Sequence, residues 1–266
     1  MSTPAYAVRD SRTMLRRNLR HMWRYPTLTL MVAGIPVVFL LLFVYVFGGT
    51  LGAGLGGPSG GRADYLAYVT PGILLMAVAG VAQGTAISVA MDMTEGIIAR
   101  FRTMAIFRPS ILTGHVVSAM TQTAASLAIV LAVALLIGFR ATASPVEWTA
   151  AVGVLAMITL AITWLSVACG LVSKTVEAAS NLPMPLMLLP FLGSGFVPTD
   201  SMPTVLRWFA EYQPFTPFTE TLRGLLLGTA IGNSAAASVA WCVGITAVSY
   251  LWARAAFNRD PGPTAT

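Results

Sequence analysis

Few residues in this sequence have the chemistry of a catalytic group. The 266 residues include ten that are acidic, two histidines, two cysteines and a single lysine. No two histidines flank a glutamate as in a zinc protease, and no serine stands between the glycines of a hydrolase elbow. No pair of carboxylates has a spacing suited to acid–base catalysis. The sequence therefore predicts a chain that is not an enzyme.

Lys174 is the only lysine that could serve a phosphate-binding loop, and its neighbours argue against that role. Such a loop has a glycine directly before the lysine, because its backbone N–H groups must approach the phosphates. In "ACGLVSKT" this position is Ser173. We expect no cofactor and no metal in this chain. If ATP drives the protein, Mg-ATP must bind to a separate chain.

Polar groups are also scarce within the apolar segments. All the acidic residues lie in loops or near the ends of expected helices, whereas ion-coupled carriers place ionisable groups inside their spans. Gln83 and Gln122 are the most polar groups at mid-span, and we expect them to form interhelical hydrogen bonds rather than bind substrate. Cys169 and Cys242 lie in apolar runs and are expected to be small buried side chains.

The composition is that of a membrane protein. Hydrophobic residues make up 56% of the chain and charged residues 10%, against about 25% charged in a soluble domain. The mean hydropathy is +0.75. The net charge of +6 does not indicate a nucleic-acid partner, because six basic residues precede the first apolar run, where they act as a topology signal.

Six segments are candidates for crossing a bilayer, which takes about 20 apolar residues in a helix. Five are clear: 27–47, 69–91, 111–139, 149–172 and 235–256. The sixth, 181–197, is shorter and contains Pro183, Pro185 and Pro190. Proline removes a backbone donor and bends a helix. We expect a kinked or partly unwound span, and a re-entrant segment is the alternative.

The distribution of basic residues predicts six spans with both termini in the cytoplasm. With this topology twelve of the sixteen basic residues are inside, and four are outside: Arg62, Arg140, Arg207 and Arg223. The expected fold is all-α. Residues 1–26 form a basic amphipathic helix at the membrane surface. Residues 27–256 form the transmembrane domain, and residues 257–266 are a cytoplasmic tail.

The stretch "MDMTEGIIARFRTMAIFRPS" places charges between the second and third spans. On a helix, Ile97, Phe101 and Met104 share one face and Arg100 and Arg102 flank it. We expect a short helix over residues 93–109 that docks into a groove of a partner. A solvated turn is equally compatible with these residues alone.

This segment resembles the ABC-2-type permeases, in particular the drug-resistance exporters related to the daunorubicin/doxorubicin permease. The matching residues are Gly96, Ile97, Ile98, Arg100, Phe101, Arg102, Ile106, Arg108 and Gly114. Met104 and Ala105 replace the Leu-Pro of that branch. Two further stretches are similar: "YVTPGILLM" and the outer segment from Gly193 to Gly228.

The resemblance implies the permease subunit of an ATP-binding-cassette exporter in a bacterial plasma membrane. It implies two ATPase copies, a second permease chain that we expect to be identical, and an amphiphilic drug, natural product or lipid as substrate. The alternatives are an ion-coupled carrier and a membrane assembly scaffold. The implied ATPase-coupling residues are Glu95, Gly96, Ile97, Arg100, Phe101, Arg102, Met104 and Ile106. The implied outer-gate residues are Phe196, Pro198, Leu206, Phe209, Pro214, Pro217 and Arg223.

The outer segment, 198–230, is expected to be two short helices that dip into the outer half of the membrane. Pro203 and Pro217 suit first helical positions. Thr216 suits a cap and Gly228 suits the end of the second helix. Ion pairs are expected within each helix, between Arg207 and Glu211 and between Glu220 and Arg223. The segment is either a gate over the exit path or a structural lid.

Overall fold

Helices make up most of the computed structural model, which describes residues 26–55, 61–94 and 109–258, and no strand occurs among these residues. The expected all-α fold is therefore confirmed. The long helices are α2 (Pro26–Leu42), α4 (Arg62–Thr94), α6 (Pro109–Leu136), α7 (Pro145–Val172) and α12 (Ser234–Asn258). A π-helical turn (Phe43–Phe47) and α3 (Gly48–Gly54) extend α2. The shorter helices are α8 (Val176–Asn181), α9 (Met184–Leu188), a 3-10 turn (Thr199–Ser201), α10 (Thr204–Tyr212) and α11 (Phe215–Leu227).

Five of the described helical segments are long and apolar enough to cross a membrane. They are Val32–Gly54, Arg62–Thr94, Leu112–Leu136, Pro145–Val172 and Ser234–Phe257. They correspond to the five clear segments of the sequence, so the chain is a multi-pass membrane protein. The sixth segment is not one continuous helix. The helix α8 ends at Asn181, Pro183 directly precedes α9, and the chain continues from Leu189 to Phe196 in turns.

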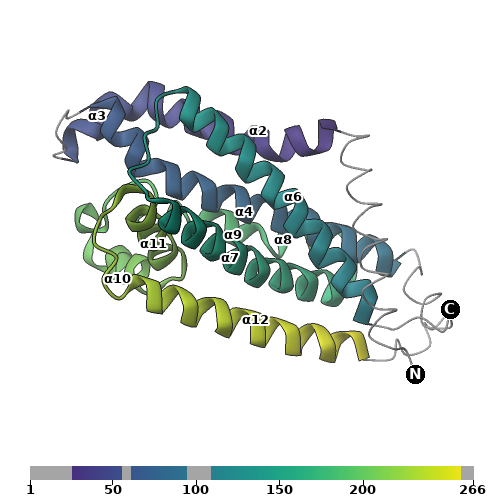
Figure 1. The fold of residues 1–266 in the computed structure, drawn as a ribbon. Helices are drawn as coiled ribbons and strands as arrows, with labels where there is room; N and C mark the ends of the chain where they lie inside the picture. Colours follow the sequence, from purple (N-terminus) through teal and green to yellow (C-terminus); the bar gives the residue numbers. More distant parts are fainter. Residues whose placement is uncertain (1–25, 56–60, 95–108, 259–266) are drawn as a thin grey trace.

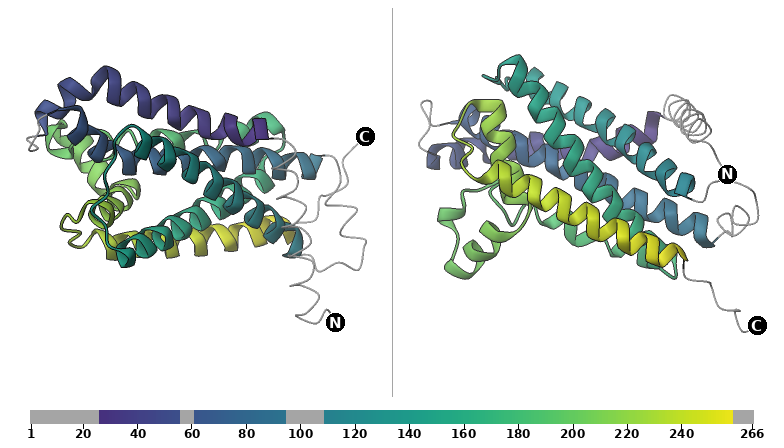
Figure 2. Two further views of the ribbon diagram at one scale, coloured as in Figure 1. Left: turned by 45° about the horizontal axis from the view of Figure 1, so that its top comes forward. Right: turned by 60° about the horizontal axis from the view of Figure 1, so that its bottom comes forward.

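The helix α4 is the centre of the bundle, and it contacts α2, α6, α7, α8 and α11 (Figures 1 and 2). In its apolar stretch 72% of the residues are buried, against 17% in α12. Small residues allow this close packing, as is usual where helices associate in lipid. A Cβ atom at Gly170 in α7 would lie only 2.6 Å from the carbonyl oxygen of Ala86 in α4.

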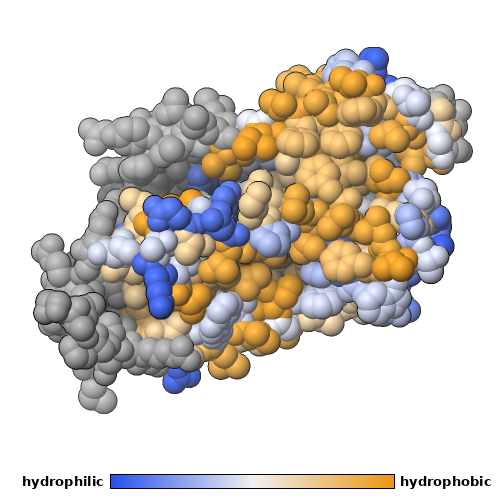
Figure 3. Space-filling model, turned by 180° about the vertical axis from the view of Figure 1, so that it is seen from behind, coloured by the Kyte–Doolittle hydropathy of each residue, from blue (hydrophilic) through white to orange (hydrophobic). Residues whose placement is uncertain are grey.

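The outer helices α2 and α12 present large apolar side chains to their surroundings. Figure 3 shows one face of the molecule, where the apolar surface is broad and the hydrophilic groups lie mainly toward its two ends. Such a surface is expected where the solvent is lipid. The most exposed examples on these helices and on the π-helical turn that extends α2 are Ile35, Val38, Tyr45, Val46, Val243, Val248 and Leu251.

The described helices end at two opposite sides of the bundle. The last turn of α4, the first turn of α6 and the end of α12 lie on one side, and α3, α10 and α11 lie on the other (Figure 1). The interfacial helix expected at 1–26 and the tail at 257–266 fall largely outside the described residues. The expected coupling helix lies mostly outside them too, but its flanks, Thr94 and Pro109, lie on the side opposite to the outer segment.

Candidate functional site

The last turn of α8 and the irregular segment that follows it, up to Pro198, depend on side chains from elsewhere in the chain for several backbone hydrogen bonds. A carbonyl group without a partner is costly at membrane depth, because no water is available there. Four carbonyl groups here accept such bonds. The side chain of Gln83 donates to the carbonyl oxygen of Ser180 at 3.0 Å, and that of Gln213 to Leu189 at 3.0 Å. The hydroxyl of Tyr68 donates to the carbonyl oxygen of Ser194 at 3.0 Å, and that of Tyr65 to Phe196 at 3.2 Å. The expectation that Gln83 forms an interhelical hydrogen bond is therefore confirmed.

Arg223 of α11 holds the same turn to α4. Its Nη2 donates to the carbonyl oxygens of Ser194 at 2.7 Å and Tyr68 at 3.2 Å. Its guanidinium carbon lies 3.8 Å from the centre of the Tyr68 ring, which is cation–π geometry. This arrangement joins three segments of the chain, α4, the 189–196 turn and α11, through one charged group.

The ion pair expected between Glu220 and Arg223 does not form. Glu220 instead accepts a hydrogen bond from the hydroxyl of Ser234 at 2.6 Å. Ser234 is the first residue of α12, so this bond ties α11 to the next long helix. The prediction was wrong because it considered only residues on one helix. Arg223 instead binds the carbonyl oxygen of Ser194 in the turn and the carbonyl oxygen and ring of Tyr68 in α4.

The ends of α10 and α11 differ in detail from the sequence expectation. Thr216 is not a cap: it lies inside α11, and its Oγ1 accepts a hydrogen bond from the backbone N–H of Ser194 at 3.2 Å. Pro214 precedes α11, and Pro217 is its third residue rather than its first. Pro203 likewise precedes α10. Gly228 does end α11, with a left-handed φ of 68°.

Phe196 joins the irregular segment to the first helix. Its ring stacks on Phe191 with 4.3 Å between ring centres, and it lies 4.8 Å from Phe43 in the π-helical turn. Such π-turns are rare and are frequently found at functional sites. Of the residues expected in the outer gate, Phe196 and Pro217 are buried, while Arg223 binds the turn next to Phe196.

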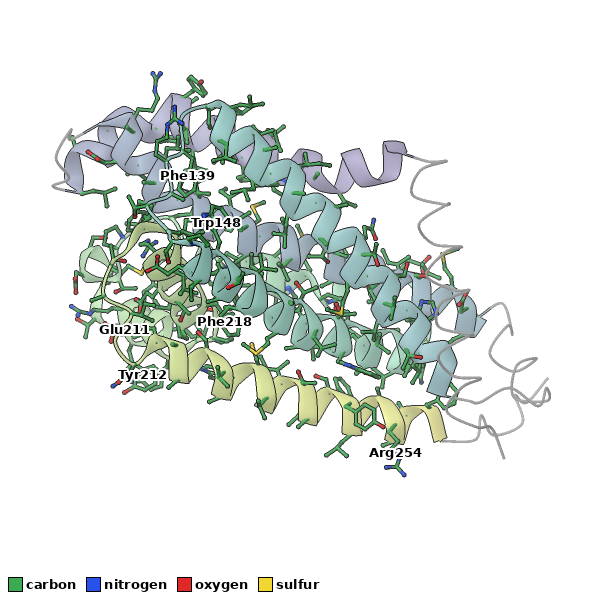
Figure 4. All side chains as sticks on the ribbon, viewed as in Figure 1. Phe139, Trp148, Glu211, Tyr212, Phe218 and Arg254 are labelled. Carbon is green, nitrogen blue, oxygen red and sulfur yellow. The ribbon has the colours of Figure 1, made fainter. Side chains whose placement is uncertain are left out.

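The helix α10 faces outward. Leu206 and Phe209, both expected in the gate, are 37% and 41% exposed, and Trp208 is 65% exposed. The expected ion pair is confirmed, with 2.7 Å between Arg207 Nε and Glu211 Oε1, and Asp200 also lies 2.7 Å from Arg207. These carboxylates raise the pKa of Arg207, and the hydrogen bond that Arg207 donates to Glu211 has the largest effect. Figure 4 shows Tyr212 at the periphery and Phe218 of α11 inside the bundle.

The comparison with known proteins identifies the family. Residues 9–227 match the model of the ABC-2 type transporter family. The chain belongs to the ABC-2 type transporter family. It is 28% identical over 227 residues to the "Daunorubicin resistance ABC transporter permease protein DrrB1" of Streptomyces coeruleorubidus, covering 82% of this chain and 77% of that protein. The chain is therefore the permease subunit of an ABC transporter, and this replaces the carrier and scaffold alternatives.

The residues predicted to couple the permease to an ATPase, Glu95 to Ile106, lie outside the described residues, so their role remains a prediction. The helices on either side are joined. His115 Nε2 of α6 lies 3.0 Å from Asp92 Oδ2 in the last turn of α4. This pair fixes the two helices relative to each other close to the predicted coupling segment.

Sequence analysis missed the residues of the permease that hold the irregular segment. Tyr65, Tyr68 and Gln213 were not singled out, although Tyr65 and Tyr68 stand one helical turn apart on α4. The three prolines signalled that carbonyl groups would lose their helical partners. The sequence thus indicated a need for donors, but it did not indicate which side chains supply them.

Proposed function

We propose that the permease exports an amphiphilic drug, natural product or lipid by alternating access, driven by ATP hydrolysis in separate ATPase subunits. The similarity to a permease named for daunorubicin resistance, over most of both chains, is the observation that carries this proposal. The broad apolar surface fits a substrate that partitions into the bilayer. Ionisable groups within the described spans lie toward the helix ends, which fits an energy source outside this chain.

We also propose that residues 176–197 form the crossing between α7 and α12, which gives six spans with both termini in the cytoplasm. The segment contacts α4 in reverse order, from Gln83 near Ser180 to Tyr65 near Phe196. Eighteen residues of α4 separate these donors, which corresponds to about 27 Å along a helix. The hydrocarbon core of a bilayer is about 30 Å thick. The segment therefore has the reach of a full crossing.

The proposed complex contains two permease chains, expected to be identical, and two ATPase chains in a bacterial plasma membrane. Movement of the ATPases enters through the coupling segment, with Phe101 as its buried anchor and Arg100 and Arg102 at the rim. The joint formed by Asp92 and His115 supports this route, because it links the helices that carry the segment.

The outer segment, 198–230, is proposed to be the gate. Arg223 connects α11 to α4, and α4 is the helix that follows directly into the coupling segment. A movement of α4 would therefore act on α11 through Tyr68 and the 189–196 turn. A pair of short helices at one side of the bundle, neither long enough to span, fits a movable cover better than a fixed wall.

Transport in inside-out vesicles tests the proposal. The permease is co-expressed with its ABC ATPase, and daunorubicin uptake is measured with and without ATP. We expect uptake that requires ATP and both subunits, and that is lost when the phosphate-binding lysine of the ATPase is replaced. Uptake that follows a proton or sodium gradient without ATP would contradict the proposal. If daunorubicin is not taken up, the same measurement is repeated with a panel of amphiphilic drugs, natural products and lipids.

A further inference from the structure

An apolar pocket lies between α6 and α7, and Arg223 and the side chains that hold the irregular segment are not among its lining residues. Its volume is about 310 Å³. The walls come from one face of α6, between Met120 and Leu131, and one face of α7, between Trp148 and Thr159. Leu74 of α4 also contributes. An apolar cavity of about 150 Å³ is enough to bind benzene, so this pocket holds a considerably larger apolar group.

The pocket has almost no polar lining. Thr159 is the one lining residue with a hydroxyl group, and that hydroxyl already donates to the carbonyl oxygen of Leu155 at 2.7 Å. The remaining lining residues are alanine, valine, leucine, methionine and Trp148. A ligand with a charge or several hydrogen-bonding groups would lose its hydration here without compensation. The apolar lining of the pocket therefore favours a purely apolar ligand group.

The mouth of the pocket opens sideways between two transmembrane helices. Its exposed residues are Ala124 and Ala128 on α6 and Val152 and Ala156 on α7, while Leu74 is buried on the inner side. All four exposed residues lie within stretches that are long and apolar enough to span a membrane. The pocket therefore opens toward lipid, and the groups that reach it are those present in the bilayer.

The length of the pocket matches one leaflet. Met120 to Leu131 and Trp148 to Thr159 each cover eleven residue steps, or about 16 Å of helix. Half of a hydrocarbon core of about 30 Å is about 15 Å. Trp148 lies close to the beginning of α7 (Figure 4), where tryptophan is favoured at the membrane interface, and Thr159 lies at the middle of α7. The pocket thus runs from the interface to the midplane, parallel to the lipid chains.

We propose that this pocket binds one acyl chain of a bilayer lipid, with the headgroup near Trp148. In the proposed orientation this is the outer leaflet. The lining also includes Leu226 of α11, which is 1% exposed. The bound chain therefore contacts the helix proposed as part of the outer gate. Lipid binding itself does not depend on which compound the transporter moves.

Photolabelling of the full complex in vesicles tests this site. The probe is phosphatidylcholine with a diazirine on one acyl chain, and adducts are located by peptide mass spectrometry. We expect adducts on 120–131 and 148–159 to be several-fold more frequent than on the exposed face of α12. Ala156→Phe fills the mouth and should lower pocket labelling several-fold. Ala240→Phe, on the exposed face of α12, is the matched control and should leave labelling of the pocket unchanged.

Three results would overturn the proposal. The first is labelling of the pocket no stronger than that of α12. The second is unchanged pocket labelling in Ala156→Phe. If that variant does not assemble, the milder variant Ala128→Leu takes its place, and unchanged labelling there has the same meaning. The third is loss of pocket labelling with excess daunorubicin while labelling of α12 persists, because this would make the exported compound the occupant.

Discussion

Gly72 of α4 and Gly195 of the irregular segment meet with their backbones in contact. A Cβ atom at Gly72 would lie 2.6 Å from the carbonyl oxygen of Gly195. The three nearest atoms are all backbone atoms of Gly195, so a side chain at Gly72 can be accepted only if the backbone of that segment moves. The close approach also brings Tyr68 and Arg223 within reach of the Ser194 carbonyl.

Gly72→Ala should therefore destabilise the permease by about 1–3 kcal/mol, the usual cost of overpacking. Gly80→Ala is the matched control on the same helix, because no heavy atom lies within 4 Å of its added Cβ. The control should be neutral or slightly stabilising, since alanine favours a helix over glycine. The measurement is the thermal midpoint of the detergent-purified protein by size-exclusion chromatography. Equal midpoints for the two variants would contradict the close contact.

Arg223→Met should impair transport strongly while the chain still inserts. The change removes the charged donor to the carbonyl oxygens of Ser194 and Tyr68 and the contact with the Tyr68 ring. Hydrogen bonds that involve a charged group contribute about 1.5–3 kcal/mol. Arg207→Met on exposed α10 is the control, because exposed ion pairs contribute about 0–1 kcal/mol. ATP-dependent uptake is measured at matched permease levels. Similar uptake by both variants would show that Arg223 does not couple α4 to α11.

At the scale of elements, α10 and α11 form a hairpin in which one helix is buried and the other is exposed. The inner helix, α11, buries Phe215, Phe218 and Leu222, and its hydrogen bonds reach α4 and α12. The outer helix, α10, leaves Val205 and Trp208 exposed. This combination suits a helix that lies in the outer headgroup layer above a helix that belongs to the bundle.

Cysteines at Asp200 and Asn233 should both react with a membrane-impermeant thiol reagent added from outside. The two positions bracket α10 and α11, and both are exposed. Cys169 and Cys242 are buried and are replaced by alanine to remove the background. Intact cells are compared with permeabilised cells. If either cysteine reacts only after permeabilisation, the hairpin crosses the membrane and the six-span topology fails.

Phe101→Ala should weaken assembly with the ATPase, because a buried aromatic anchor at an interface contributes about 2 kcal/mol or more. Arg102→Ala, predicted to lie at the rim of the same segment, should cost less. Co-purification of the two subunits measures the effect, and insertion of the permease is checked separately. Normal assembly and transport with Phe101→Ala would leave the docking role without support.

At the scale of the whole molecule, the bundle is organised around α4. This helix reaches from the outer segment, past the contacts of Tyr65 and Tyr68 with the irregular segment, to the pair formed by Asp92 and His115 beside the predicted coupling segment. A single helix that reaches both sides of the bundle suits the proposed transmission of movement across the membrane. In the proposed function, the energy for that movement comes from the ABC ATPase partner that the family implies.

The purified permease alone should therefore hydrolyse no ATP, and activity should appear when the ATPase subunit is added. The reason is that Ser173 stands where a phosphate-binding loop needs glycine. Phosphate release is measured for each subunit and for the complex. A variant of the ATPase without its phosphate-binding lysine controls for contaminating enzymes. Hydrolysis by the permease in the absence of any ATPase would contradict this prediction.

The sequence by itself determined the class of protein and the position of its five long spans. Hydrophobic segments of membrane length can be recognised locally, because each helix forms its own backbone hydrogen bonds and its apolar side chains can contact lipid instead of a protein core. The break in the sixth segment was also local, since Pro183, Pro185 and Pro190 remove donors wherever the chain goes. The pair between Arg207 and Glu211 was predictable for the same reason.

Only the tertiary structure decided how the remaining polar groups are used. Arg223 has Glu220 one turn away, but it binds carbonyl oxygens 29 and 155 residues distant in sequence. Thr216 likewise binds Ser194 instead of capping its own helix. Carbonyl groups freed by proline must find donors, and the nearest donors depend on which helices pack together. The pocket between α6 and α7 has the same origin, because a space between two helices belongs to neither sequence segment alone.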